Sequence, residues 1–125
     1  MPKRILLAED EPNIVETLRF LLQRAGFDVL VCANGREALA TVQSHPPDVL
    51  ILDMMLPEIS GLEILRQIRA HHSAAATPVL MLTAKGQRVD RERAEEAGAD
   101  IFLTKPFANS ELVAAVEQLA ARQPG

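Results

Sequence analysis

Residues 49–53 have the sequence VLILD, an apolar run typical of a buried strand that ends at Asp53. Three further strand-like runs are also followed by polar or charged side chains: ILLA at 5–8 before Glu9 and Asp10, VLML at 79–82 before Thr83, and IFLT at 101–104 before Lys105. The carboxyl ends of parallel strands lie at one edge of a sheet, where open α/β sheets bind their ligands. We therefore expect these side chains to face one another across a single crevice.

The segments between these runs have the periodicity of amphipathic helices, so strands and helices alternate along the chain. Helices are expected to begin after Asn34 and Ser60, because each is followed three residues later by glutamate, as in a capping box. The other predicted elements are a first helix between Pro12 and Gly26, a second strand at 28–32, a fourth helix at 88–97 and a fifth at 110–122. Five such units predict an α/β fold with a doubly wound parallel sheet.

The 125 residues suffice for one domain with a single core. We expect this domain at residues 1–122, with 123–125 as a tail or the start of a linker. A formal net charge of −4 argues against direct nucleic-acid binding and against attraction to an anionic membrane. The one cysteine, Cys32, is interpreted as a core residue, and the sequence has neither a signal pattern nor a long apolar run. These features predict a cytoplasmic protein.

Glu9, Asp10 and Asp53 would concentrate negative charge in the crevice. Two carboxylates ~4 Å apart repel by about 4 kcal/mol at an effective dielectric constant of ~20, so the cluster needs a cation. The site offers oxygen ligands without a nearby histidine or cysteine, a set that favours Mg²⁺, with Mn²⁺ as a substitute, over zinc. The alternative is a solvated acidic turn at 9–11 beside a helix N-terminus.

A carboxylate beside magnesium can attack phosphorus, and Asp53 at the end of the most apolar strand is the natural nucleophile. The Thr83 hydroxyl and the Lys105 ammonium could then hold the other phosphoryl oxygens. Gly61 would allow the loop that follows Asp53 to approach the strand closely. Each residue also has a structural interpretation. Asp53 could cap a turn, Thr83 could be an ordinary strand residue, and Lys105 could be a solvated surface residue.

The motifs ILLAEDEPN (5–13), DVLILDMMLPEISGLEIL (48–65), PVLMLTAKG (78–86) and GADIFLTKPF (98–107) resemble the receiver domain of response regulators in two-component signalling. The resemblance covers nearly the whole chain, and it implies a flavodoxin-like sheet in the order 2-1-3-4-5, as in the chemotaxis member of the family. It also implies that Asp53 is the phosphoacceptor. The implied magnesium ligands are Asp10, Asp53 and the Met55 backbone carbonyl, with Glu9 acting through water. Thr83 and Lys105 would contact the phosphoryl group, and the Lys105-Pro106 peptide would be cis.

The family further implies a switch that couples Thr83 to the aromatic residue at Phe102, where tyrosine is common. Its implied partners are a histidine kinase or histidine phosphotransfer protein and a downstream protein or effector domain bound through the 88–122 face. A phosphorylation-dependent homodimer is also known in the winged-helix branch. Arg91, Asp100 and Glu111 match ion-pair positions of that dimer, whereas Ile101 and Ala115 depart from them.

Two other classes of protein share parts of this pattern. A flavodoxin-like cofactor binder would need a phosphate-binding Gly/Ser/Thr loop after the first strand, where this chain has EDEP at 9–12, and its sequence contains no Trp or Tyr. An aspartate-nucleophile Mg²⁺-dependent phosphatase would place an acid two residues after the nucleophile, where this chain has Met55. We therefore expect a phosphoacceptor that catalyses only its own phosphorylation and dephosphorylation, and no enzyme acting on external substrates.

Overall fold

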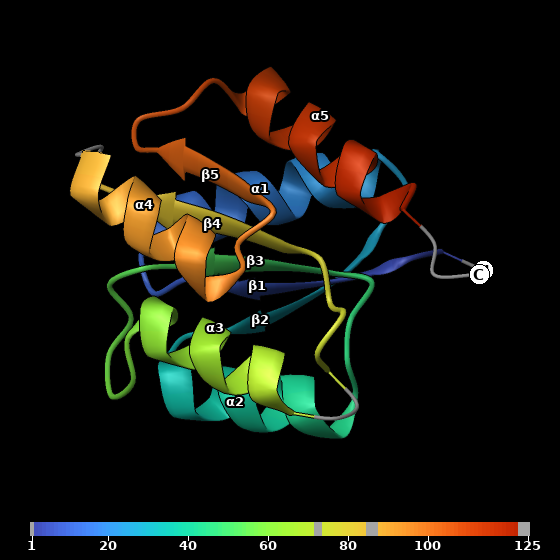
Figure 1. Cartoon of the computed structure of the whole chain (residues 1–125). Coiled ribbons are helices and arrows are strands. Elements are labelled where there is room, and N and C mark those ends of the chain that lie inside the picture. The colour runs from blue at the N-terminus through green and yellow to red at the C-terminus, as the bar shows by residue number, and fades with distance from the viewer. Residues whose placement is uncertain (1, 72–73, 85–87, 123–125) are drawn as a thin grey trace.

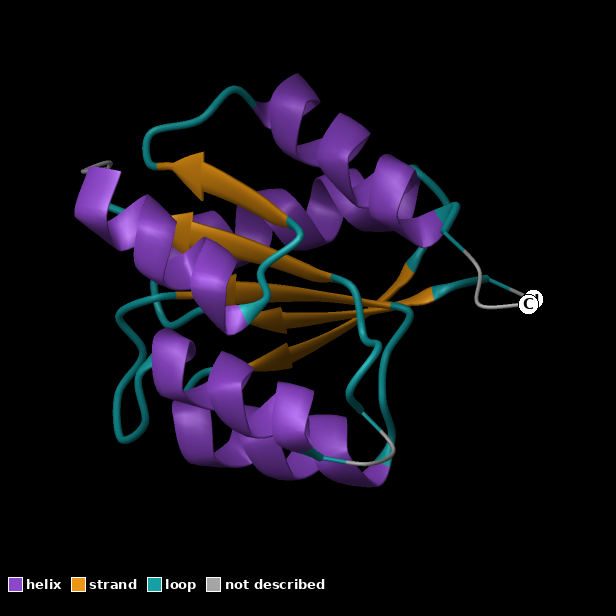
Figure 2. Ribbon diagram, in the orientation of Figure 1, coloured by secondary structure: helices purple, strands orange, loops and turns teal. Residues whose placement is uncertain are grey.

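The computed structural model describes residues 2–71, 74–84 and 88–122. Its centre is a parallel five-stranded sheet in the order β2-β1-β3-β4-β5, with helices on both faces (Figures 1 and 2). The strands are β1 (Arg4–Ala8), β2 (Asp28–Cys32), β3 (Val49–Asp53), β4 (Val79–Thr83) and β5 (Ile101–Thr104). The helices are α1 (Pro12–Arg24), α2 (Gly35–Ser44), α3 (Gly61–Ala70), α4 (Arg88–Ala97) and α5 (Asn109–Ala120). The predicted α/β fold and strand order are confirmed.

Local sequence sets most of the helix boundaries. The side chains of Asn34 and Ser60 accept hydrogen bonds from backbone N–H groups three residues ahead, at 2.9 and 3.2 Å, as the capping-box pattern predicted. The fifth helix runs from Asn109 to Ala120 rather than over 110–122. Its N-cap residue Ala108 has extended backbone with no side-chain cap, so the helical conformation starts directly after it.

The sheet separates two apolar clusters. The helices α1 and α5 cover one face, and α2, α3 and α4 cover the other (Figure 1). The central strands β3 and β4 are buried along their whole length, whereas the edge strand β2 is only partly covered. Cys32 lies in the core, as expected. Burial on both faces explains why the sequences of β3 and β4 are continuous apolar runs instead of alternating ones.

The strand register brings the polar strand ends together. Parallel pairing sets Ala8 beside Leu52, Asp53 beside Leu82, and Thr83 beside Thr104. The ladder continues past the strand ends, because the Lys105 N–H donates to the Thr83 carbonyl at 2.7 Å. The residues that follow β1, β3, β4 and β5 therefore meet at one edge of the sheet.

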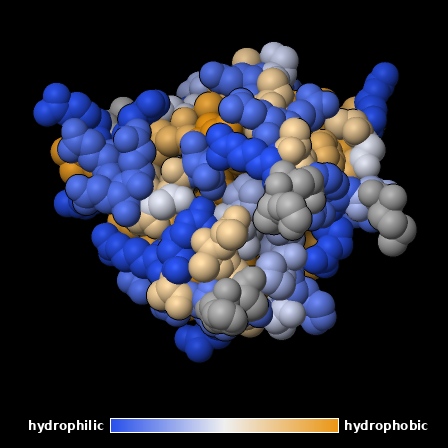
Figure 3. Space-filling model, turned by 45° about the vertical axis from the view of Figure 1, so that its right-hand side comes forward, coloured by the Kyte–Doolittle hydropathy of each residue, from blue (hydrophilic) through white to orange (hydrophobic). Residues whose placement is uncertain are grey.

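Within the described residues, no helix has both the length and the apolar character needed to cross a membrane. The face drawn in Figure 3 is mainly hydrophilic, and its apolar side chains form small separate patches.

Candidate functional site

Three carboxylates meet at the carboxyl edge of the sheet. Glu9 and Asp10 follow β1, Asp53 ends β3, and one oxygen from each lies within 4.8 Å of the others. Glu9 is fully buried and Asp53 is nearly so, whereas Asp10 is exposed. The predicted acidic cluster is thus present, and the burial of Glu9 and Asp53 distinguishes it from a fully solvated turn.

Glu9 is held by the backbone and by Lys105. Its Oε2 accepts the backbone N–H groups of Asp10 and Glu11, at 3.1 and 3.2 Å. Its Oε1 lies 2.8 Å from the Lys105 ammonium as an ion pair but has no well-directed hydrogen bond. Burial raises the pKa of Glu9, and the contact with Lys105 only partly opposes this effect.

Lys105 points into the cluster from the end of β5. Besides Glu9, its Nζ lies 3.3 Å from Asp53 Oδ2 and 3.4 Å from Glu11 Oε1. Burial alone would lower the pKa of Lys105, but the Glu9 and Asp53 carboxylates outweigh it and the pKa is raised. The ammonium is therefore charged and offsets part of the repulsion between the carboxylates. The Lys105-Pro106 peptide is cis, as the resemblance implied.

The loop after β3 is packed closely around Asp53. Asp53 Oδ1 accepts the Met55 N–H at 3.1 Å, and the Gly61 N–H donates to the Met54 carbonyl at 2.9 Å. A Cβ atom on Gly61 would lie 2.3 Å from the Asp53 carbonyl oxygen, so this position requires glycine. The same loop contains Glu58 with a φ of 72°, a left-handed conformation that no sequence pattern predicted. Met55 itself is 66% exposed.

Thr83 and Phe102 lie on the same face of the sheet. Thr83 ends β4 and is 1% exposed, and Phe102 pairs with Met81, two residues before Thr83. Because side chains alternate along a strand, the face that carries Met81 also carries Thr83. Phe102 is 8% exposed and belongs to the cluster covered by α2, α3 and α4. The two residues predicted as a switch are thus near neighbours on adjacent strands.

The donor set fits a hard divalent cation. Its three carboxylates supply oxygen ligands alone, and the buried Glu9 Oε1 still lacks a directed donor. Asp10 is exposed, which leaves the cluster open to solvent on one side. The arrangement suits an ion that keeps part of its water shell, as Mg²⁺ does.

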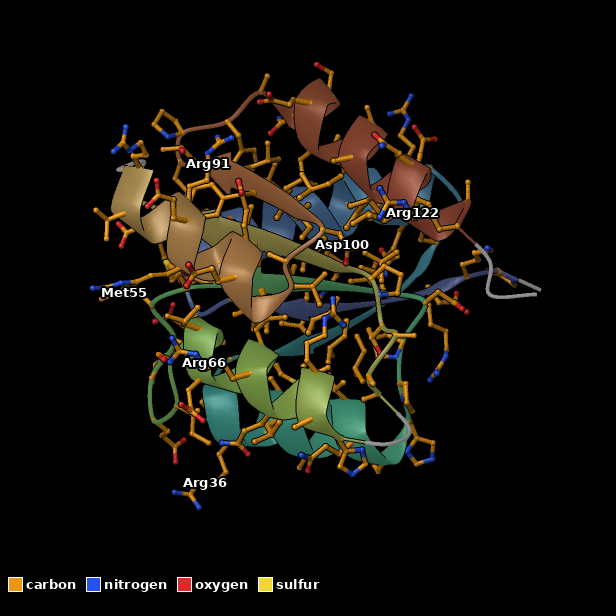
Figure 4. All side chains as sticks on the ribbon, viewed as in Figure 1. Arg36, Met55, Arg66, Arg91, Asp100 and Arg122 are labelled. Atoms are coloured by element: carbon orange, nitrogen blue, oxygen red, sulfur yellow. The ribbon has the colours of Figure 1, made fainter. Side chains whose placement is uncertain are left out.

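Two arginines that sequence reasoning did not single out bind Asp100. Its carboxylate lies 3.1 Å from Arg69 of α3 and 3.2 Å from Arg122, which follows α5. Figure 4 labels Asp100 and Arg122. Arg69 also donates to the Gly98 and Thr77 carbonyls, at 2.7 and 2.6 Å. Burial lowers the pKa of Arg69, and the Asp100 carboxylate opposes this effect. A half-buried cation that binds the carbonyls of two loops leaves no periodic signal in the sequence.

A cleft of about 560 Å³ adjoins Lys105 and was also not foreseen. Its walls come from α1 and from the segment after β5, and include Glu11, Ile14, Leu18, Pro106 and Phe107.

Comparison with known proteins agrees with this geometry. The family model for the response regulator receiver domain matches residues 5–117. The alkaline phosphatase synthesis transcriptional regulatory protein PhoP of Bacillus subtilis is 40% identical over 122 residues, which are 98% of this chain and 50% of PhoP. The transcriptional regulatory protein TrcR of Mycobacterium tuberculosis is 45% identical over 121 residues, 97% of this chain and 46% of TrcR. The chain therefore spans about half the length of these relatives.

A solved structure with the same fold contains a metal ion. The receiver domain of sensor histidine kinase PA1611 from Pseudomonas aeruginosa has a TM-score of 0.89 and 30% identity, with 98% of this chain and 100% of that one covered. That structure has a magnesium ion coordinated in its active site cleft. From the family match, the sequence relatives and the shared fold, we conclude that this chain belongs to the response regulator receiver domain family.

Proposed function

We propose that Asp53 takes one phosphoryl group from the phosphohistidine of a histidine kinase or histidine phosphotransfer protein. A carboxylate oxygen of Asp53 forms the new bond to phosphorus, and the phosphorus–nitrogen bond breaks with its electron pair left on the imidazole. The single observation that carries this proposal is the position of Asp53, a buried carboxylate 3.3 Å from the Lys105 ammonium and inside the acidic cluster. The family match makes this chain a signalling phosphoacceptor domain, and catalysis of its own phosphorylation and dephosphorylation stays a prediction.

The other site residues have distinct proposed roles. Asp10, Asp53 and the Met55 carbonyl would bind Mg²⁺ directly, and Glu9 would do so through water. Bound Mg²⁺ would reduce the repulsion between the carboxylates and the incoming phosphoryl oxygens. Lys105 would exchange part of its contact with Glu9 for a phosphoryl oxygen. The Thr83 hydroxyl would donate to another oxygen, and its movement would be coupled to Phe102.

We further propose that the signal leaves through the 88–122 face. The relatives are named as transcriptional regulators, and this chain matches about half of each. We therefore assign residues 1–122 to the receiver domain and 123–125 to a tail or linker, with an effector domain or separate protein as the downstream partner. Neither the phosphatase nor the flavodoxin-like cofactor binder is supported by the family match.

The proposal is tested by incubation with acetyl phosphate and Mg²⁺. The intact mass of the wild-type chain should rise by the mass of one phosphoryl group, because the nucleophile and the cluster lie in one chain. A chelator should remove the effect. Labelling that continues without a divalent cation would contradict the magnesium assignment.

Two substitutions should separate metal binding from phosphoryl contacts. Asp10→Asn removes one of the three carboxylates and should weaken Mg²⁺ binding roughly tenfold or more. Lys105→Ala removes the competing cation, so Mg²⁺ should bind at least as well while phosphorylation falls. Titration with Mg²⁺, followed by NMR, measures the first effect, and intact mass measures the second. Equal weakening of Mg²⁺ binding by both substitutions would refute this division of roles.

A further inference from the structure

A cation–π contact joins α4 to the residue predicted as the aromatic switch. The guanidinium carbon of Arg91 lies 5.3 Å from the centroid of the Phe102 ring, which is within the range of about 6 Å for this interaction. Arg91 lies one turn before the buried Ala94, so its side chain leaves α4 on the side that faces β5 (Figure 4). The guanidinium therefore covers the solvent side of a ring whose other side is packed in the core.

Charge pairing along α4 does not explain where Arg91 lies. Arg88 forms an ion pair with Glu92, four residues ahead, at 3.3 Å. Glu95 stands at the same spacing from Arg91, yet no ion pair of Arg91 is found among the described residues. The guanidinium lies over the ring instead. Exposed pairs of this spacing contribute little, so a half-desolvated aromatic face can compete with them.

The contact with Arg91 affects the position of the ring more strongly because residue 102 is phenylalanine and not tyrosine. A tyrosine could form a hydrogen bond through its hydroxyl in an outward position, whereas Phe102 would expose its ring and gain no bond. The buried position of the ring thus rests on core packing and on the cover that Arg91 provides.

We propose that Arg91 is a positioning residue for the switch: it holds the Phe102 ring in the buried place beside Thr83 and so couples α4 to the phosphoryl site. This inference rests on the proposed function, because it gives Arg91 a part in the coupling of Thr83 to Phe102. A cation–π contact at a partly exposed site changes the equilibrium between buried and exposed ring by about 2- to 5-fold. A ligand that prefers the buried-ring state binds more weakly when that state is less populated.

The test compares two arginines of the same helix. Arg91→Met keeps the aliphatic length and removes the charge, and Arg93→Met is the matched control because Arg93 is exposed and has no ring contact among the described residues. Three-bond NMR couplings across χ1 of Phe102 report the fraction of buried ring. Arg91→Met should lower the buried-to-exposed equilibrium constant about 2- to 5-fold and raise the Kd for beryllofluoride with Mg²⁺. Arg93→Met should change neither quantity.

A second background separates positioning from a general effect on α4. Phe102→Leu keeps an apolar side chain and removes the aromatic face, so Arg91→Met should have no further effect on the beryllofluoride Kd in that variant. Additive effects, or an equal effect of Arg93→Met, would overturn the inference. Failure of the wild-type chain to take up a phosphoryl group would instead overturn the proposed function. The Phe102 couplings are measured in the metal-free protein and need no phosphoryl group. A failure of the Arg91 inference can therefore be distinguished from a failure of the proposed phosphoryl uptake.

Discussion

Asp53→Asn is expected to abolish phosphoryl uptake from acetyl phosphate, so that the mass gain falls from one phosphoryl group per chain to none. The asparagine carboxamide has the size of the aspartate side chain, and its oxygen can still accept the hydrogen bond from the Met55 N–H. In the wild-type chain the Met55 nitrogen lies 3.1 Å from Asp53 Oδ1. It is not a nucleophile toward phosphorus, and it removes one negative charge from the cluster. Because the shape is retained, the fold should remain intact, and circular dichroism should show an unchanged spectrum.

Asp28→Asn is the matched control for this result. Asp28 begins β2, is exposed and lies at the opposite end of the sheet from the acidic cluster. The control should be labelled as fully as the wild-type chain. Labelling of Asp53→Asn to the wild-type extent would show that another residue is the nucleophile.

Gly61→Ala is expected to lower the free energy of unfolding by at least about 2 kcal/mol, at the upper part of the range for overpacking. The added Cβ would lie 2.3 Å from the Asp53 carbonyl oxygen and 2.8 Å from Met54 Cα. Both neighbours are backbone atoms, so the end of β3 or the start of α3 must move. That movement displaces Asp53, and Mg²⁺ binding should weaken together with stability. Urea denaturation measures the first effect and Mg²⁺ titration the second.

Gly26→Ala separates a local clash from the general cost of replacing glycine. Gly26 has a φ of 99° and no heavy atom within 4 Å of an added Cβ, so only backbone strain of about 1–2 kcal/mol is expected. It follows α1, far from the cluster, and Mg²⁺ binding should be retained. An unchanged Mg²⁺ affinity in Gly61→Ala would show that the loop does not position Asp53.

The sequence predicted those features that depend on short patterns. The run VLILD is apolar at every position before Asp53 because both faces of β3 are buried, and this pattern placed the nucleophile at a strand end. The glutamates after Asn34 and Ser60 located the starts of α2 and α3. The strand-end rule then brought Glu9, Asp10 and Asp53 into one crevice.

Features set by contacts between distant segments were not predictable in this way. Arg69 donates to carbonyl groups of two loops, and Arg91 lies over Phe102 rather than pairing along its own helix. From sequence alone, charged residues on a helix surface are interpreted as solvated. Helical periodicity shows which side of the helix a residue lies on, but it does not show which residue of another segment it contacts. The left-handed backbone of Glu58 was missed since glycine or asparagine usually marks that conformation.

Residue-level mapping of the phosphoryl group tests the central claim most directly. After incubation with acetyl phosphate and Mg²⁺, borohydride reduces an acyl phosphate to an alcohol, and the peptide that contains the reduced residue is identified by mass spectrometry. The account predicts conversion of Asp53 to homoserine in the wild-type chain and none without Mg²⁺. Reduction at Asp10 or at any other residue, with Asp53 unmodified, would contradict it.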